Sequence, residues 1–419
     1  MGFNKQRPSR DLEPTGTALA FLRRMLPAWQ YVVDGRRDLR IDWLRGLAMT
    51  CVIINHSKIS SWLSWFSYER FWVVTAAEVF VVLSGIVLGT VYGRKLVHSG
   101  WLSVVRGLSR RALTLYVAFV AVTLSVPLLS LAGIDVSSLM GQDERSPALV
   151  WLFDQRTMTT DAWRDVALMR DGPWAFQIIG LYVWLVVAAV PCLVTLHFAG
   201  WRPLLAVSWS LYVWYCITPH ALTKAQFESS FPLLAWQLLF VHGIVIGYHR
   251  ERLTAFVSRC PKVVSIAIGA AAAAFIVFAL CNPWVEGPSW LHWSVVSPER
   301  FTYLYFNYFT LTDLRIGRVL NLAVALPIGY ALLTRCWAIA RPLGIVLVTL
   351  GRQSLGAFVL HVYGILLIAH IPALSDDLFI NTLVQVLLIV TIAALLNGVE
   401  RLPLGRARVR TVPIRSLAA

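Results

Sequence analysis

Ionisable side chains interrupt the first two long apolar stretches of the chain, and three of them could take part in chemistry: Arg45 and His56 in 41–60, and Glu78 in 71–93. An ionisable group at membrane depth costs about 2.5–3.5 kcal/mol, so each of the three needs a partner or a function. A histidine can act as a general base near neutral pH. Eleven residues, or roughly 16 Å of helix, separate Arg45 from His56, so the group that orients the imidazole must come from another helix.

Glu78 is the candidate for that orienting group. It lies about seven residues from the outer end of the second stretch, and His56 lies about four residues from the outer end of the first. An antiparallel hairpin would place both side chains at similar depth, where the carboxylate could fix the imidazole tautomer. A hydrogen bond that only locks two helices is the alternative. Asp42 and Arg45, three residues apart on one helix face, predict a structural ion pair.

The elements that position these residues are membrane helices. The chain has 419 residues, of which 58% are hydrophobic and 14% charged, and a net charge of +15. This composition, with a mean hydropathy of +0.66, excludes an ordinary soluble domain, a disordered chain and a disulfide-stapled secreted protein. It predicts an all-α polytopic membrane protein. Ten spans are expected, at 41–60, 71–93, 104–132, 174–198, 203–219, 231–249, 262–282, 317–334, 343–371 and 378–398.

The distribution of Lys and Arg sets the expected orientation. Most of these residues fall in the segments that share a side with the N-terminus, so both termini are predicted to be cytosolic. Residues 1–36 form a basic tail, with a predicted amphipathic surface helix at Thr17–Val33, and residues 399–419 form a second basic tail. The outer loop 282–316 is rich in Trp and Tyr, which predicts either an interfacial aromatic belt or a sugar-stacking surface.

Several chemistries have no support in the sequence. No P-loop phosphate motif occurs, no serine sits in a Gly-x-Ser-x-Gly elbow, and the histidines are too far apart to predict a metal site. The net positive charge is assigned to the membrane rather than to nucleic acid. Arg110 and Arg111 lie deep enough in the third span to hold the phosphates of a cytosolic ligand, with plain membrane anchoring as the alternative.

Several segments resemble the OpgC family of membrane acyltransferases, within the acyltransferase-3-like group. Arg45 and His56 reproduce its arginine, ten intervening residues and histidine, and Phe80 with Ser84-Gly85 resembles its Phe-x-x-x-Ser-Gly element. The other similar segments are RRALTLY (110–116), WQLLFVHGIVIGY (236–248), DLRIGRVLN (313–321) and GRQSLGAFVLHVY (351–363). The resemblance implies an acyltransferase domain over residues 37–398.

The family resemblance implies an enzyme of the bacterial inner membrane that moves a succinyl or other short acyl group from cytosolic acyl-CoA to a periplasmic or cell-envelope glycan. Acyl-CoA, most plausibly succinyl-CoA, would be a co-substrate, with no permanently bound cofactor. The expected partners are the glycan acceptor and the bilayer, with a homo-oligomer or a glucan-synthesis complex left open. A transporter or flippase of a glycan or lipid-linked sugar, and a non-catalytic partner in glucan synthesis, are the alternatives.

Roles for individual residues follow from the same resemblance. His56 is expected to be the general base, with Glu78 and Arg45 in the catalytic site. The donor would be held by four residues of the second and third spans: Arg110, Arg111, Tyr116 and Ser84. Six more are substrate-binding candidates: Trp236, Gln237, Asp313, Arg318, Asn321 and His361. A structural Asp313–Arg318 ion pair is the alternative for two of these.

Overall fold

The structure is a computed structural model, and it describes residues 31–33, 37–140, 160–257, 259–371 and 377–401. These residues are almost entirely helical, apart from a two-stranded antiparallel pair, β1 (Val32–Val33) and β2 (Arg37–Asp38). The predicted helix Thr17–Val33 and both tails lie largely outside the described residues, and the described end of that segment, β1, is a strand. Residues 141–159 lie outside them too.

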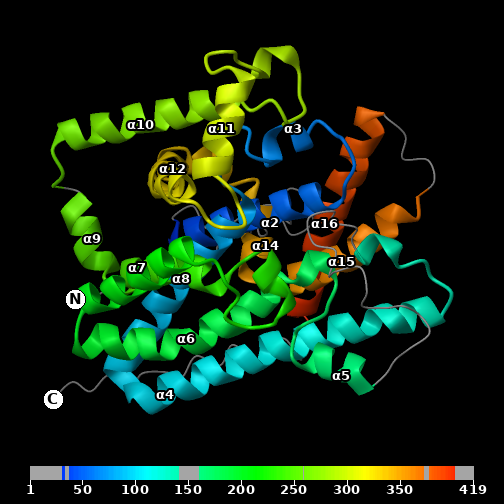
Figure 1. The fold of residues 1–419 in the computed structure, drawn as a ribbon, viewed down its shortest axis with the longest axis horizontal. Coiled ribbons are helices and arrows are strands. Elements are labelled where there is room, and N and C mark those ends of the chain that lie inside the picture. The colour runs from blue at the N-terminus through cyan, green and yellow to red at the C-terminus, as the bar shows by residue number, and fades with distance from the viewer. Residues whose placement is uncertain (1–30, 34–36, 141–159, 258, 372–376, 402–419) are drawn as a thin grey trace, which may run out of the picture.

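Helices make up most of the described chain, as Figure 1 shows. In order they are α2 (Leu39–His56), α3 (Ser64–Ser67), α4 (Ala76–Leu131), η1 (Ser137–Leu139), α5 (Thr160–Ala167), η3 (Trp174–Phe176), α6 (Ile178–Phe198), α7 (Trp201–Ile217), η4 (Gln226–Ser229), α8 (Leu233–Tyr248), α9 (Arg250–Val257), α10 (Lys262–Leu280), η5 (Ser289–Leu291), α11 (Pro298–Tyr308), α12 (Ile316–Arg335), α13 (Trp337–Ala340), α14 (Gly344–Arg352), α15 (Ser354–Ala369) and α16 (Leu378–Arg401).

Helix α4 contains two helical limbs that meet at Gly100, whose φ of 71° breaks the helical geometry. The two limbs correspond to the second and third predicted spans, and Figure 1 shows the chain turning sharply between them. A left-handed φ is accessible to glycine without steric penalty, so Gly100 is the residue that allows this turn. The first limb carries Glu78 and Ser84, and the second carries Arg110, Arg111 and Tyr116.

Helix α8 packs against the first limb of α4 through glycines on both sides. A Cβ at Gly85 would lie 2.3 Å from the Phe240 carbonyl oxygen, and one at Gly247 would lie 2.1 Å from that of Ile86. The two backbones are therefore in direct contact, which only glycine permits. The Gly-x-x-x-Gly spacing of Gly85 and Gly89 predicts a helix-packing contact from the sequence alone, and the structure confirms it.

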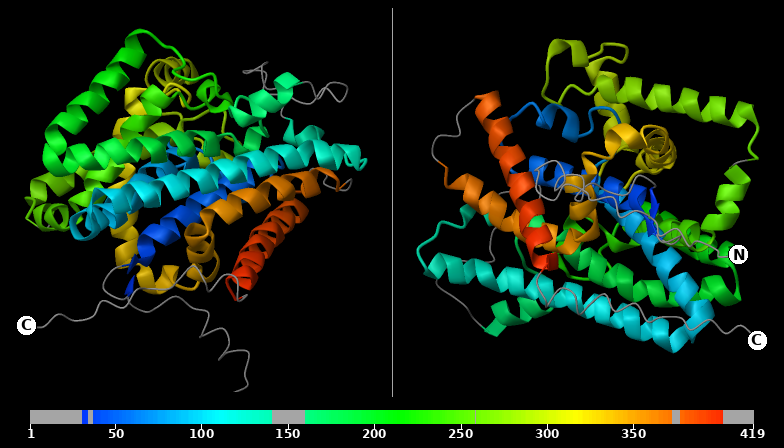
Figure 2. Two further views of the ribbon diagram at one scale, coloured as in Figure 1. Left: turned by 90° about the horizontal axis from the view of Figure 1, so that it is seen from below. Right: turned by 180° about the vertical axis from the view of Figure 1, so that it is seen from behind.

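The ninth predicted span is not one straight helix. Helices α14 and α15 meet at Gln353 with a bend of 102°. Helix α14 packs against α2, where a Cβ at Gly46 would lie 1.8 Å from the Leu347 carbonyl oxygen. Helix α15 then turns away to lie beside α16, as both views of Figure 2 show. The break carries α15 and its histidine, His361, toward the outer end of α2.

The start of α2 is fixed by a buried polar cluster around Asp38, the helix N-cap. Its carboxylate accepts hydrogen bonds from Arg40 (2.8 Å), from the Tyr330 hydroxyl (2.7 Å) and from Arg250. Burial opposes ionisation, but the hydrogen bonds and charges of these partners lower the pKa of Asp38 below its usual value. Asp38 thus ties α2 to α9 and α12 and fixes where Arg45 and His56 stand.

Among the described residues, five helices are long and apolar enough to cross a membrane, and six if the bent α14–α15 pair counts as one span. Several of the other predicted spans form helices that fall short of this measure, among them α2, α7 and α8, with 18, 17 and 16 residues. A multi-pass membrane protein is therefore supported, whereas ten spans and the cytosolic position of both termini stay predictions.

Candidate active site

His56 ends α2, and its ring meets His361 of α15. The distance from His56 Nδ1 to His361 Nε2 is 3.1 Å. The other nitrogen of His361, Nδ1, lies 2.5 Å from the Phe358 carbonyl oxygen. His361 is fully buried, whereas His56 is half-buried. Two imidazoles and a carbonyl oxygen thus form one hydrogen-bonded chain that ends at His56.

The direction of these hydrogen bonds follows from the Phe358 carbonyl oxygen at the end of the series. A carbonyl oxygen only accepts hydrogen bonds, so Nδ1 of His361 carries a proton. In a neutral His361, Nε2 is then an acceptor, so Nδ1 of His56 must donate to it. That assignment leaves the lone pair of His56 on Nε2, the arrangement that a general base requires.

His56 also lines a chamber of about 860 Å³ among segments expected on the outer side. The Trp174 ring lies 4.7 Å from the His56 ring between centroids, and Lys58 Nζ lies 4.7 Å from the Trp174 ring. Aromatic side chains make up much of the remaining wall: Tyr68, Phe231, Trp284, Tyr305 and Phe306. The chamber has the size and the aromatic walls that a site for a sugar-sized ligand needs.

The predicted pairing of Glu78 with His56 is wrong, because both carboxylate oxygens of Glu78 are bound elsewhere. Arg318 donates to them from Nε (2.6 Å) and Nη2 (2.9 Å), and the Thr75 amide donates at 2.6 Å. Glu78 is the third residue of α4, and a glutamate there reaches back to the N-cap residue in a capping box. His361 takes the place that the sequence had assigned to Glu78.

Arg318 binds a second carboxylate that the sequence reasoning missed. Its Nη1 donates to Glu69 at 2.7 Å, and the Tyr305 hydroxyl donates to the same carboxylate at 3.1 Å. Glu69 lies in the chamber wall with a φ of 45°, an uncommon conformation for a residue other than glycine. Burial raises the pKa of Glu69, although the Arg318 charge opposes the shift. The sequence signal that could have identified Glu69 is an acidic residue in the short loop between the first two predicted spans.

The predicted ion pair between Asp42 and Arg45 is also wrong. Asp42 accepts a hydrogen bond from Arg37 Nε at 2.7 Å. Arg45 instead donates from Nη2 to the Ser354 hydroxyl at 2.6 Å. Its Nε is buried and makes no hydrogen bond, so a charged donor faces the interior unused. Such a group is expected to bind an acceptor from a ligand.

Arg45 lines a small cavity of about 50 Å³ together with four further polar residues, Ser84, Arg111, Tyr182 and Ser354. The structure thus brings together Ser84 and Arg111 of the predicted donor site with Arg45 of the predicted catalytic site. Arg110 is exposed and does not line this cavity, and the Tyr116 hydroxyl donates to the Ala167 carbonyl oxygen at 2.9 Å. Tyr182, on α6, was not singled out from the sequence.

Two phenylalanines line both this cavity and the chamber of His56. They are Phe80 of α4 and Phe358 of α15, whose ring centroids are 5.3 Å apart. The Arg45 guanidinium carbon lies 5.9 Å from the Phe80 ring centroid. The two rings form a thin apolar partition with arginines on one side and a histidine on the other.

The remaining substrate-binding candidates make contacts within the protein. Trp236 Nε1 donates to the Thr312 carbonyl oxygen (3.2 Å), and Gln237 exchanges hydrogen bonds with Ser208. Asp313 accepts from the Tyr215 hydroxyl (2.9 Å), and Arg315 is its ion-pair partner at 3.6 Å, so the alternative pairing with Arg318 is wrong. Asn321 is fully buried, and neither of its side-chain polar atoms has a partner.

Fold and site together define a multi-pass helical membrane protein with a histidine pair beside an aromatic chamber, and two phenylalanines separate that chamber from an arginine-lined cavity. The family model described as OpgC protein matches residues 37–402, so the chain belongs to the OpgC family. Membership implies a transferase role in the modification of glucans. No curated protein and no solved structure matches the chain.

Proposed function

We propose that this protein is an integral-membrane O-acyltransferase of the bacterial inner membrane. It moves a succinyl or other short acyl group from cytosolic acyl-CoA to hydroxyl groups of a periplasmic or cell-envelope glycan. The observation that carries the proposal is the chain from the Phe358 carbonyl oxygen through His361 to His56, which leaves a basic nitrogen beside a sugar-sized chamber.

The reaction needs one proton transfer in each direction. Nε2 of His56 removes the proton from a sugar hydroxyl as its oxygen attacks the thioester carbonyl carbon. The carbon–sulfur bond then breaks, and the leaving thiolate takes the proton back from the imidazolium. A positioned base of this kind contributes about 10²–10⁴-fold to the rate.

The donor is proposed to enter at the arginine cavity and the acceptor at the chamber. Arg111 and the unused Nε of Arg45 offer charge-assisted hydrogen bonds to donor oxygens. The aromatic walls offer faces on which a pyranose ring can pack. The acyl group then has to pass between Phe80 and Phe358, whose rings must move apart because they are in contact.

The test is mass spectrometry of cell-envelope glycans from a deletion strain complemented with wild type or with His56→Ala. The wild type should restore an acyl group, whose mass identifies it, and His56→Ala should not, at matched membrane abundance. Transfer above a tenth of the wild-type level in His56→Ala would remove His56 from the role of base.

A transporter is the second candidate, favoured by the bent α14–α15 pair, because broken helices mark many transport sites. If the protein is a transporter, His56→Ala should leave the acylation of the glycan unchanged and alter only the amount of glycan outside the cell. The same glycan analysis therefore separates the two functions.

A further inference from the structure

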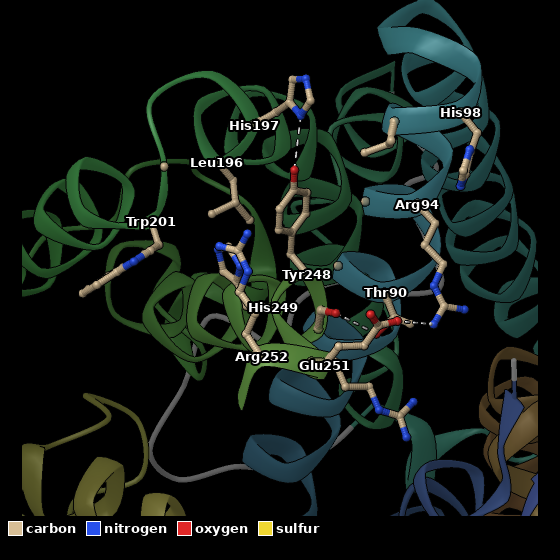
Figure 3. A pocket seen from close by; sticks show the side chains of 16 residues that line it. Thr90, Arg94, His98, Leu196, His197, Trp201, Tyr248, His249, Glu251 and Arg252 are labelled. Atoms are coloured by element: carbon tan, nitrogen blue, oxygen red, sulfur yellow. Dashed lines mark hydrogen bonds and ion pairs between the residues drawn. The ribbon is translucent and has the colours of Figure 1, made fainter. Parts of the chain in front are cut away.

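A second cavity of about 560 Å³ lies at the expected cytosolic side, where α4, α6, α7, α8 and α9 converge (Figure 3). It shares no lining residue with the arginine cavity or with the chamber of His56. Its size is that of a small-molecule site. The proposed acyl transfer makes no use of it.

The charges around this cavity are mostly positive. Arg94 comes from α4 and Arg252 from α9, and both are exposed to solvent. Arg250 lines it too but is already bound to Asp38. The one acid in the wall, Glu251, lies 3.7 Å from Arg94, and its side chain is 92% exposed. Figure 3 shows Arg94 and Glu251 reaching toward each other. An exposed, loosely held carboxylate can be displaced from Arg94 by a stronger anion.

Histidines supply further hydrogen-bonding groups at the same place. His98, His197 and His249 all line the cavity. His197 Nδ1 lies 3.2 Å from the Tyr248 hydroxyl, as Figure 3 shows, whereas Nε2 of His249 is buried and makes no hydrogen bond. That nitrogen is closed to solvent and therefore does not face the open cavity.

Glycines keep the cavity open. A Cβ at Gly93 would lie 2.6 Å from the Tyr248 ring, so only glycine fits at that point of the wall. Gly200, in the turn between α6 and α7, has a φ of 85°, a conformation that favours glycine. No other atom lies within 4 Å of the position that an added Cβ would take, so the cavity is open on this side. Backbone without side chains allows a ligand to approach closely.

From this arrangement we propose that the cavity binds a phosphate ester at the cytosolic face of the membrane. Arg94 and Arg252 supply the charge, since guanidinium groups bind phosphate oxygens in pairs. Two ligands present this chemistry here: the headgroup of an anionic phospholipid and the phosphates of a soluble nucleotide. Val97 and Trp201, both apolar and more than 45% exposed, line the same cavity, so a lipid headgroup could reach it from the bilayer.

The experiment compares two charge-matched double variants of the full chain, purified in detergent with phosphatidylcholine. Arg94→Gln/Arg252→Gln removes two charges from the cavity. Arg106→Gln/Arg259→Gln removes two exposed charges from the same side of the protein but outside the cavity. Native mass spectrometry measures retention of phosphatidylglycerol, and calorimetry measures binding of adenosine 3′,5′-bisphosphate. Thermal unfolding checks that both variants are folded.

The cavity variant should bind one of the two probes about tenfold more weakly than the wild type, because two charge-assisted contacts are lost. The control variant should stay close to the wild type. Which probe responds identifies the source of the phosphate. If neither probe binds the wild type, or if both double variants bind equally, the cavity is not a phosphate site.

Discussion

The smallest unit of the proposed site is a pair of imidazoles, His56 and His361, in which one histidine fixes the tautomer of the other. His361 has no access to solvent, and its Nδ1 is held by the Phe358 carbonyl oxygen. It can therefore present only an acceptor to His56. An imidazole in this position fixes the tautomer of its neighbour as a carboxylate does elsewhere, without placing a second charge in the membrane interior.

A substitution of His361 tests this role. In His361→Leu the acceptor is lost, so His56 can rotate or change tautomer, and kcat should fall by about 10²-fold or more. The KM for the glycan should change little, because the sugar is bound by the chamber walls. In His361→Gln the amide oxygen can accept the same hydrogen bond, so part of the activity should return. Equal loss in both variants would show that His361 acts through packing alone.

Asp171 gives a residue-scale prediction of pH dependence. Burial, and then the nearby charge of Asp165, raise the pKa of Asp171 to about 6, although Arg170 opposes the shift. Because the folded state holds the proton more tightly than the unfolded state, this group favours folding below its unfolded pKa. That contribution is lost as the pH rises through about 6.

Asp171→Asn should therefore raise the Tm in detergent at pH 8 and leave it unchanged near pH 4. The measurement is thermal unfolding of wild type and variant across this range. A difference in Tm that is the same at both pH values would mean that the substitution acts by shape or hydrogen bonding and not through titration of the carboxyl group.

At the scale of elements, glycines determine which helices carry the site. Gly46 follows Arg45 directly and lets α2 touch the backbone of α14. Helix α14 is the first half of the bent α14–α15 pair. The contact therefore couples the position of Arg45 to that of Ser354, its hydrogen-bond partner at the start of α15. A methyl group between the two helices would separate them.

Gly46→Ala should lower thermal stability strongly, because its Cβ would lie 1.8 Å from the Leu347 carbonyl oxygen. Overpacking of this kind costs about 1–3 kcal/mol or more. Gly329→Ala is the matched control, since a Cβ there meets no atom within 4 Å. The control should be neutral or gain up to about 1 kcal/mol from helix propensity. Unfolding curves in detergent measure both, and similar values would argue against tight α2–α14 packing.

The sequence predicted these elements better than it predicted their partners. Long apolar helices and helix packing at Gly85 and Gly89 follow from local pattern, and both are confirmed, whereas the number of membrane spans stays a prediction. The pairing of Glu78 with His56 failed because depth along a helix says nothing about the direction in which a side chain points. The break at Gln353 brings His361 to His56. No proline or glycine stands at residue 353, so the sequence did not indicate a break there.

At the scale of the whole molecule, the positive charges and the proposed base lie on opposite sides of one partition. Arg45 and Arg111 line the small cavity, His56 lines the chamber, and Phe80 and Phe358 belong to both. The partition separates the two cavities until an acyl group crosses it, which would limit hydrolysis of a bound donor thioester by water from the chamber. A long flexible carrier arm could cross it, whereas a free acyl phosphate could not.

This arrangement separates two adjacent arginines that the sequence treats alike. Arg111 lines the small cavity, and Arg110 is exposed on the next position of the same helix. Arg111→Gln should therefore raise the KM for acyl-CoA by about tenfold, because one charge-assisted contact to the donor is lost. The rate at saturating donor should fall less, because this contact is remote from the thioester and stabilises ground state and transition state alike. Arg110→Gln should have a smaller effect on KM. Acyl-CoA titration of both variants in nanodiscs measures the difference, and equal effects would mean that the donor does not use the small cavity.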